Sequence, residues 1–523
     1  MNRRVVLILL IVAVAGAAFS LLGRRGGAEP ETLTVMAGSE LENLEPFFPD
    51  IERATGVVLT VDYIGTLDGV DRLSGGEQVD LAWFSHAKYL TLIDRERIVA
   101  QEKIMLSPVV LGVKEAQARA WGWVDNPELS WREIAAKAER GDLRYAMTNP
   151  ASSNSGFTAL MGVVAALSGT DAVAVGVSDA NRDAVQGFFR GQALTSGSSG
   201  WLADAYVREQ EQLDGIINYE SVLMELNESG RLREPLYLLY PKEGIVTADY
   251  PLILLNGEKR AAYDKLVAYL RSPEVQERIM TETLRRPAVP QVDLSNAFPK
   301  NILVELPFPG SLEVIDSILY SYLNEVRVPS HAFFVLDVSG SMAGERLGQL
   351  QSALRNLTGL DESLTGQFAR FSDRERLTLL TFSSGVTDVQ DFSLSAGAER
   401  EAQIERIRSY VGGLNADGGT AIFSALQAAY TLAEVAYETD PDRYYSVVLM
   451  SDGENNEGVT EGALLDFHRS LPETTRSIKT FPILFGEADQ GSLETVAEET
   501  GGRLFDGRGE DLSAVFKQIR GYQ

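Results

Sequence analysis

Five oxygen-bearing side chains in three short segments have the types and spacing of a site for a hard divalent cation. In Asp337-Val-Ser339-Gly-Ser341, hydroxyls follow a carboxylate at two and four residues. Further along the chain, Thr420 follows two glycines and Asp452 lies in a Ser-Asp-Gly-Glu run. Mg²⁺ takes oxygen ligands in near-octahedral geometry and usually keeps several waters. One charged and two neutral oxygens therefore leave room for water or for a carboxylate of a partner.

The predicted secondary structure brings these residues to comparable positions. Asp337 and Asp452 directly follow the predicted strands 332–336 and 445–450, and Thr420 directly precedes a predicted helix. Open α/β sheets bind ligands where loops converge at the carboxyl ends of the strands. Asp, Ser and Thr also cap helices and form turns, which is an alternative explanation for any one segment. Capping does not require all three segments at once, so together they predict a site for Mg²⁺, with Mn²⁺ or Ca²⁺ as alternatives.

Residues 330–523 resemble the von Willebrand factor A (VWA) family, whose metal-ion-dependent adhesion site (MIDAS) combines three such segments. By this resemblance the metal ligands are Asp337, Ser339, Ser341, Thr420 and Asp452, the last acting directly or through a water. The resemblance also implies a doubly wound sheet and a binding function, because the open metal position in such domains typically takes an acidic side chain of a partner protein. A minority of VWA domains serve ATP-driven machines, but this sequence contains no Walker motif.

Polar residues also follow predicted strands in the N-terminal part of the chain. Ser39, Ser85 and Ser155 lie at strand-to-helix junctions, where free backbone N–H groups attract anions, and Thr66 adds a hydroxyl. The alternative is that the serines only cap their helices. Glu40 would repel an anion if it faced the same cleft. The site therefore favours a cationic or neutral solute, or it has lost solute binding and serves as a spacer or partner surface.

Residues 32–300 resemble a bacterial extracellular solute-binding protein of the two-lobed periplasmic class. The resemblance rests on short runs such as Gly38-Ser-Glu40, Asp80-Leu-Ala-Trp-Phe84 and Asp249-Tyr-Pro-Leu252. Such proteins close two lobes over a small solute. The resemblance thus implies that Ser39, Thr66, Ser85 and Ser155 face one cleft.

Strands alternate with helices along the whole chain, which predicts an α/β protein. Its fold class is a two-lobed periplasmic-binding-protein-like domain followed by a doubly wound, Rossmann-like VWA domain. Five prolines between residues 285 and 309 mark the boundary. The predicted units are a signal anchor or signal peptide at 1–26, the solute-binding-like domain at 32–300, a linker with a connecting helix at 301–329 and the VWA domain at 330–523.

The N-terminal segment is the one candidate for membrane attachment. Residues 5–22 contain no charge and are flanked by pairs of arginines. The length of this apolar run and the basic residues after it favour an uncleaved signal anchor, although small residues within it would also suit cleavage. Either reading places the rest of the chain outside the cytoplasm, and the anchor predicts a single-pass protein of the cell membrane.

Composition narrows the function further. A hydrophobic fraction of 45% and a charged fraction of 23% are typical of globular domains. The net charge of −27 argues against a nucleic-acid partner. The chain has no cysteine, and its three histidines are too far apart in sequence to form a zinc motif.

We therefore predict a non-enzymatic binding protein, anchored in the membrane and exposed outside the cytoplasm. Its VWA domain binds a divalent metal and the acidic side chain of a protein partner, and its N-terminal domain binds a small polar solute. The alternative function is an ABC-transporter solute receptor with an accessory VWA domain. A third possibility is an enzyme whose dispersed carboxylates converge in the fold.

Overall fold

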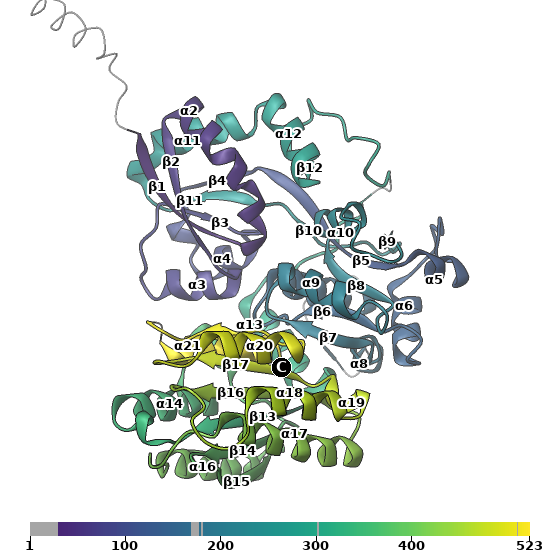
Figure 1. The fold of residues 1–523 in the computed structure, drawn as a ribbon. Helices are drawn as coiled ribbons and strands as arrows, with labels where there is room; N and C mark the ends of the chain where they lie inside the picture. Colours follow the sequence, from purple (N-terminus) through teal and green to yellow (C-terminus); the bar gives the residue numbers. More distant parts are fainter. Residues whose placement is uncertain (1–29, 169–176, 179–180, 301–302, 510) are drawn as a thin grey trace, which may run out of the picture.

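The computed structural model describes residues 30–168, 177–178, 181–300, 303–509 and 511–523. They form two lobes above a C-terminal domain (Figure 1). The predicted α/β fold class is confirmed. Within the described ranges, no helix combines the length and the apolar character needed to cross a membrane. The predicted anchor or signal peptide at 1–26 lies outside the described residues.

The first lobe is built on a five-stranded sheet in the order β2-β1-β3-β11-β4. Its strands are β1 (Glu31–Ala37), β2 (Val57–Tyr63), β3 (Leu81–Trp83), β4 (Ala100–Lys103) and β11 (Pro251–Leu254). Its helices are η1 (Ser39–Phe47), α2 (Phe48–Thr55), α3 (Thr66–Ser74), α4 (Lys88–Ile93), η2 (Arg95–Arg97), η4 (Gly257–Lys259), α11 (Arg260–Leu270) and α12 (Pro273–Thr283). The helical segment between β1 and β2 is divided into η1 and α2, because Pro46 and Pro49 interrupt the backbone hydrogen bonds of a continuous helix.

The second lobe surrounds the long strand β5 (Met105–Lys114). Its other strands are β6 (Tyr145–Thr148), β7 (Gln192–Ser196), β8 (Gly215–Tyr219), β9 (Leu236–Leu239), β10 (Thr247–Ala248) and β12 (Arg286–Pro287). Its helices are α5 (Glu115–Ala120), α6 (Trp131–Glu139), α7 (Asn154–Ser168), α8 (Arg182–Arg190), α9 (Ser199–Glu209) and α10 (Glu220–Glu228). The chain crosses between the lobes after β4, before β11 and after α12.

Two of these crossings contain a residue other than glycine with a positive φ. Tyr250, directly before β11, has a φ of 36°, and Leu284, directly after α12, has a φ of 50°. Residues other than glycine rarely adopt such φ angles, and they do so in folded proteins where the surrounding structure enforces the angle. Local backbone strain is thus found at two of the points where the chain crosses between the lobes.

The predicted connecting helix is present as α13 (Leu312–Ser321) and the π-helical turn η5 (Tyr322–Val326). Ile315, Ile318 and Leu319 are buried in the same apolar core as the two lobes. The connection is therefore packed onto the N-terminal domain.

The C-terminal domain has a six-stranded sheet in the order β15-β14-β13-β16-β17-β18, parallel except for β15. Its strands are β13 (Ser330–Asp337), β14 (Arg376–Phe382), β15 (Val386–Ser393), β16 (Tyr444–Ser451), β17 (Lys479–Leu484) and β18 (Phe505–Asp506). One apolar core lies on each face of the sheet. The predicted doubly wound arrangement is confirmed.

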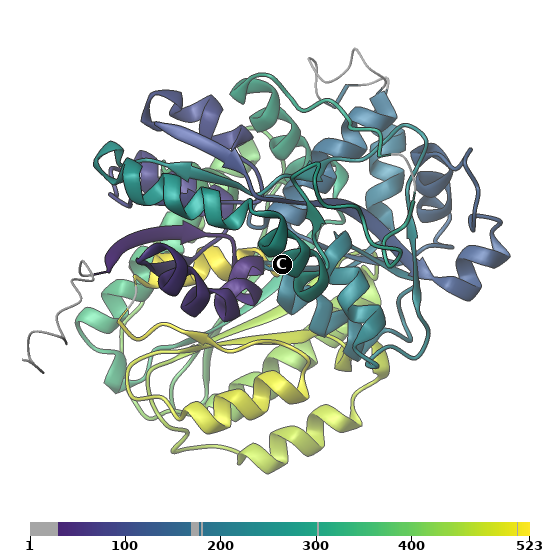
Figure 2. The same ribbon diagram turned by 90° about the horizontal axis from the view of Figure 1, so that it is seen from above.

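Helices cover both faces of this sheet. They are η6 (Gly340–Met342), α14 (Glu345–Arg355), η7 (Asn356–Leu360), α15 (Leu364–Ala369), α16 (Ala398–Gly412), α17 (Ile422–Thr439), α18 (Glu461–Ser470), α19 (Glu473–Arg476), α20 (Gln490–Glu499) and α21 (Leu512–Arg520). Seen from above, the C-terminus that follows α21 lies near the centre of the molecule (Figure 2). Gln523 is accordingly buried.

Buried histidines should make the fold sensitive to acid. His86 lies between the rings of Phe157 and Phe308, and its Nε2 is 3.2 Å from Thr158 Oγ1. Burial, with a smaller effect of Lys88, lowers the pKa of His86 to about 4. The unfolded chain takes up this proton near its ordinary pKa of about 6.5. Stability from this group is thus complete above pH 6.5 and is lost as the pH falls towards 4.

Acidification from pH 7 to pH 4 should lower the unfolding free energy of the wild type. We expect this decrease to be smaller in His86→Gln by roughly 3 kcal/mol. Denaturant titrations at the two pH values measure this difference. His331, whose pKa is also lowered to about 4 by burial, gives a matched variant, His331→Gln, with a separate and additive effect. An unchanged pH dependence in His86→Gln would contradict the prediction.

Candidate functional site

The three segments predicted to bind a metal meet at one edge of the C-terminal sheet. Asp337 ends β13, and Asp452 directly follows β16, the strand paired with β13 in parallel. The chain leaves these two neighbouring strands towards opposite sides of the sheet order. Such a switch point opens a crevice at the strand ends, where open α/β sheets bind ligands. Thr420 reaches the same place from the loop before α17.

Hydrogen bonds hold the three segments together. The Gly340 N–H donates to the carbonyl oxygen of Gly418, at 3.0 Å, and so ties the first segment to the second. The Thr420 N–H donates to Asn456 Oδ1, at 2.8 Å, and ties the second segment to the third. The loop geometry is therefore fixed by contacts outside the predicted ligand set.

The side-chain oxygens of the predicted ligands form a short chain of contacts. Ser339 Oγ is 3.0 Å from Ser341 Oγ, and Ser341 Oγ donates to Asp452 Oδ1, at 2.7 Å. The Ser339 N–H donates to Asp337 Oδ1, at 2.8 Å. The side chains of Asp337, Ser339, Thr420 and Asp452 are buried. The structure thus brings four of the five predicted ligands into direct contact and places Thr420 beside them.

Two further residues at this site were not predicted from the sequence. Ser451 Oγ donates to Asp337 Oδ2, at 2.5 Å, and Arg346 Nη1 forms an ion pair with Asp452 Oδ2, at 2.5 Å. Burial raises the pKa of Asp337, and the nearby carboxylate of Asp452 adds to this effect, whereas hydrogen bonds from Ser339 and Ser451 oppose it. A cation beside the two carboxylates would relieve the same electrostatic cost. The proximity of Arg346 to the motif was visible in the sequence, but its partner was not.

The residues present fit a small hard cation. Gly453 lies beside the hydroxyls, since a Cβ there would be in ordinary contact with Ser341 Oγ, at 3.7 Å, and with Thr420 Oγ1, at 3.9 Å. All of the donors are oxygens, as Mg²⁺ prefers. Across the described part of the chain, no group of three or more His, Cys, Asp or Glu is placed to hold a metal. Binding here would therefore depend on hydroxyls as well as on the two carboxylates.

The four predicted solute-binding residues differ in their surroundings. Thr66 and Ser85 belong to the first lobe and are buried, and neither hydroxyl has a hydrogen-bond partner among the described residues. Ser155 belongs to the second lobe, and its Oγ is 2.8 Å from Thr148 Oγ1 and 2.7 Å from Ser199 Oγ. Ser39 is half-buried at the start of η1. The hydroxyls of Thr66 and Ser85 thus have hydrogen-bonding capacity left for a ligand, whereas Ser155 is already hydrogen-bonded within its own lobe.

Several polar residues that the sequence did not mark as binding residues surround these positions. Tyr219 and Asn154 come from the second lobe, and Tyr250 and Arg285 come from the crossings between the lobes. Glu40, which the sequence indicated as a charge that would repel anions, faces them from the first lobe. Burial raises the pKa of Glu40, and Arg285, Tyr219 and Asn154 partly offset this rise. We call these residues, with Thr66 and Ser85, the interlobe cluster.

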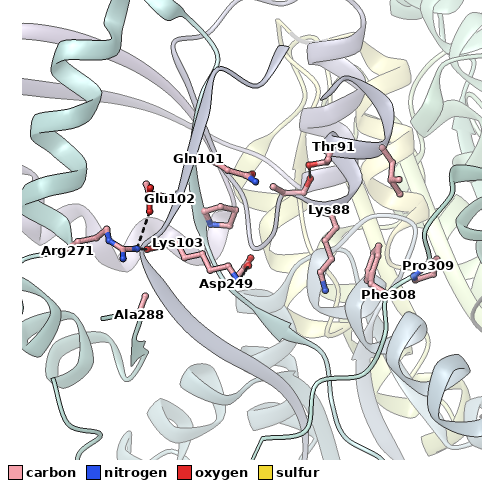
Figure 3. Close-up of a pocket in the computed structure, with 13 residues that line it drawn as sticks. Lys88, Thr91, Gln101, Glu102, Lys103, Asp249, Arg271, Ala288, Phe308 and Pro309 are labelled. Carbon is pink, nitrogen blue, oxygen red and sulfur yellow. Dashed lines mark hydrogen bonds and ion pairs between the residues drawn. The ribbon is translucent and has the colours of Figure 1, made fainter. Parts of the chain in front are cut away.

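A wide, open pocket of about 700 Å³ lies elsewhere, between α4, β4 and the segment around Phe308 (Figure 3). None of the predicted site residues lines it. Its charged side chains are largely paired, because Lys103 lies 2.9 Å from Asp249 and Arg271 lies 3.4 Å from Glu102. The pocket therefore offers fewer unsatisfied groups to a ligand than the interlobe cluster does.

Comparisons with known proteins agree with both halves of the fold. A family model described as a bacterial extracellular solute-binding protein matches residues 33–282, and the model of the von Willebrand factor type A domain matches residues 333–518. Among solved structures, a periplasmic binding protein from Actinobacillus pleuropneumoniae is similar, with 16% identity, a TM-score of 0.43 and coverage of 57% of this chain and 98% of that one.

Curated relatives include two inter-alpha-trypsin inhibitor heavy chains. Human heavy chain H4 is 26% identical over 44% of this chain and 23% of its own length, and heavy chain H3 of Mesocricetus auratus is 30% identical over 29% and 16%. The chain thus spans less than a quarter of the length of these relatives. With two family models matching successive parts of one sequence, the chain joins a domain of the bacterial extracellular solute-binding protein family to a von Willebrand factor A domain.

Proposed function

We propose that this chain is a membrane-anchored, extracytoplasmic binding protein with two ligand sites. In the VWA domain, Asp337, Ser339, Ser341, Thr420 and Asp452 bind a divalent cation, Mg²⁺ before Mn²⁺ or Ca²⁺. An acidic side chain of a protein partner completes the coordination of the metal. In the N-terminal domain, a small polar solute binds between the lobes. The apolar segment at the N-terminus holds the protein in the membrane.

The observation that carries the metal site is the contact chain from Ser339 through Ser341 to Asp452. Two aspartates and three hydroxyl side chains lie together at the strand ends, with Ser341 on the exposed side and the other four buried. A cation there would supply the positive charge that the carboxylates lack and would polarise a carboxylate brought by the partner. The residues of the chain contribute by fixing the positions of the ligands.

The interlobe cluster supports the second part of the proposal. Its unpaired polar groups favour solute binding as a function of the N-terminal domain. They also support the alternative function, an ABC-transporter solute receptor in which the VWA domain is an accessory. The two functions differ in what the metal site does: a receptor with an accessory domain would bind its main ligand regardless of the metal, whereas our proposal requires the metal for partner binding.

We expect Mg²⁺ to bind the purified chain at a ratio of one to one, and Asp337→Ala to weaken this binding by about 100-fold or more, because the variant lacks a charged ligand. Isothermal titration calorimetry measures both affinities. Asp466, which lies on α18 with 83% of its side chain exposed, provides a matched control, Asp466→Ala, that should leave binding unchanged. Partner binding should be lost in Asp337→Ala and on chelation. A partner that both conditions leave bound would contradict the metal-dependent function.

The Arg346–Asp452 ion pair generates a separate prediction. Removal of the guanidinium in Arg346→Ala leaves the buried Asp452 carboxylate without its counter-charge. Because 35% of the Arg346 side chain is exposed, we expect the variant without metal to lose only about 1–2 kcal/mol of unfolding free energy. Saturating Mg²⁺ should restore most of this loss, since the ion supplies the missing positive charge. Denaturant titration with and without Mg²⁺ measures both effects.

The control is Arg355→Ala, an exposed arginine on the same helix. A loss in Arg346→Ala that Mg²⁺ does not reduce would show that Arg346 acts only on packing and has no electrostatic link to the metal site.

A further inference from the structure

Seven polar atoms of the interlobe cluster are buried without a hydrogen-bond partner in the described part of the chain. They are Glu40 Oε1, Thr66 Oγ1, Ser85 Oγ, Asn154 Oδ1, Tyr219 OH, Tyr250 OH and Arg285 Nε. A buried polar group that makes no hydrogen bond costs about 1–3 kcal/mol, and native structures contain few of them. Seven in one region therefore indicate a place where a ligand supplies the missing partners.

The members of the cluster lie close to one another. The rings of Tyr219 and Tyr250 have centroids 5.9 Å apart, and the Arg285 guanidinium lies 5.2 Å from the centroid of the Tyr250 ring. Burial raises the pKa of Tyr219 well above the ordinary value of a tyrosine; the neighbouring Glu40 adds to this rise, whereas the neighbouring Ser85 opposes it. The two lobes thus meet in one polar site.

Arg285 is held in place by neutral acceptors. Its Nη1 donates to Asn43 Oδ1, at 2.7 Å, and its Nη2 donates to the carbonyl oxygen of Glu40, at 2.6 Å. Neither acceptor is a carboxylate, so the guanidinium keeps its positive charge beside the cluster. The Glu40 carboxylate is the opposite charge in the same site. Arg285 and Glu40 offset each other electrostatically, so the site has no net charge that would favour an anionic or a cationic solute.

The hydroxyl groups of an uncharged solute best match the hydrogen-bonding groups of the interlobe cluster. Glu40 Oε1 and Asn154 Oδ1 can only accept hydrogen bonds, as long as Glu40 is ionised, while the serine, threonine and tyrosine hydroxyls can donate or accept. A sugar or polyol offers several O–H groups that both donate and accept, together with apolar C–H faces that pack against the two tyrosine rings.

We propose that the interlobe cluster binds a small, uncharged, hydroxyl-rich solute, a sugar or polyol. This inference rests on the solute-binding part of the proposed function and adds the class of ligand. The site lies between closed lobes, so the solute enters when they open.

The test uses the purified full chain with defined probes. We measure thermal shift and calorimetric affinity for glucose, mannitol and myo-inositol. Phosphate and citrate are the anionic probes, spermidine is the cationic probe, and a ferric salt tests the cluster as a set of oxygen ligands. We expect at least one uncharged probe to bind saturably and to raise the melting temperature by mass action. The charged probes should not bind.

Two tyrosine variants and a control distinguish a binding site from a packing cluster. Tyr219→Phe and Tyr250→Phe each remove an unpartnered hydroxyl, so each should raise the melting temperature without solute by about 2 °C and weaken solute binding by about tenfold. Tyr145→Phe, also in a buried position, removes a hydroxyl that donates to the carbonyl oxygen of Phe188, at 2.9 Å. This control should lower the melting temperature and leave solute binding unchanged.

The outcomes separate the two levels of the proposal. Binding of a charged probe, lost in Tyr219→Phe, would overturn the ligand class and leave solute binding intact. Binding of no probe, together with lower stability in both cluster variants, would overturn the ligand site itself and the solute part of the proposed function.

The VWA domain contacts both lobes of the N-terminal domain. Figure 1 shows α21 directly below α3 of the first lobe. There the Asp71 carboxylate accepts hydrogen bonds from the Leu364 N–H, at 2.9 Å, and from Thr365 Oγ1, at 2.7 Å. Contacts to the second lobe join Asn149 Nδ2 to the carbonyl oxygen of Arg520, at 3.2 Å, and Lys479 to Glu209, at 2.6 Å. One face of the VWA domain therefore spans the boundary between the lobes.

Close packing of small residues makes this junction sensitive to the lobe positions. A Cβ on Gly65, in the first lobe, would lie 2.7 Å from the carbonyl oxygen of Ser152, in the second. A Cβ on Gly521, in the VWA domain, would lie 2.7 Å from Ser152 Oγ. All three units thus touch at Ser152. Opening of the lobes would separate these groups or break the contacts at Asp71.

We infer that docking of the VWA domain holds the lobes closed, so that lobe closure and VWA docking stabilise each other. The absence of native cysteine permits spin labels at two introduced cysteines, Glu52→Cys on α2 and Arg132→Cys on α6, both exposed. We expect electron–electron distance measurements to give one narrow interlobe distance in this parent. Asp71→Ala and Thr365→Val, which remove opposite sides of one contact, should both broaden and lengthen it.

Asp204→Ala breaks an exposed ion pair with Arg231 inside the second lobe and is the control. Its distance distribution should match that of the parent. Unchanged distributions in Asp71→Ala and Thr365→Val, with both variants folded by thermal melting, would overturn the inference.

Discussion

The VWA site depends on the burial of two carboxylates at the ends of neighbouring parallel strands. Asp337 and Asp452 have no exposed surface, and removal of a charge from water is costly unless hydrogen bonds or an opposite charge compensate it. Here Ser339 and Ser451 donate to Asp337, while Ser341 and Arg346 serve Asp452. The loops are shaped by this requirement. A divalent cation at the candidate site would satisfy the same requirement.

The interlobe cluster meets the same physical problem in a different way. The hydroxyls of Tyr219, Tyr250 and Ser85 have no hydrogen-bond partner among the described residues. Apolar groups of similar shape would make the protein more stable at these positions. A buried polar atom without a hydrogen-bond partner lowers the unfolding free energy, whereas an apolar group in its place does not. Several unpartnered polar groups at one place are typical of a site that favours ligand binding over stability.

The two sites are connected by packed structure. The lobes meet the VWA domain through α15 and the end of α21, and α21 packs against α14, the helix that begins directly after the first metal segment. Arg346, near the start of α14, reaches Asp452. A contiguous path of ordinary packing and hydrogen bonds thus leads from the boundary between the lobes to the candidate metal site. Its energetic coupling is open to measurement through the lobe contacts at Asp71.

By itself, the sequence determined the fold class, both families and the three segments that meet at the candidate metal site. The position of each segment after a predicted strand was sufficient there, because Asp337 ends β13 and Asp452 directly follows β16, which pairs with β13 in parallel. Local pattern was weaker at the sheet edge. Strand β15 and helix α16 were not predicted, since β15 is largely exposed and α16 lacks a strong apolar face.

Only the tertiary structure decided which partners neutralise the buried charges. Arg346 and Asp452 lie 106 positions apart, and Glu40 and Arg285 lie 245 apart. The sequence indicated that Glu40 would repel an anion, but it could not show that Arg285 offsets this charge from a crossing between the lobes. Such pairings arise from the order of strands in a sheet and from the closure of two lobes. Neither leaves a periodic trace in the chain, because the residues involved are neighbours only after folding.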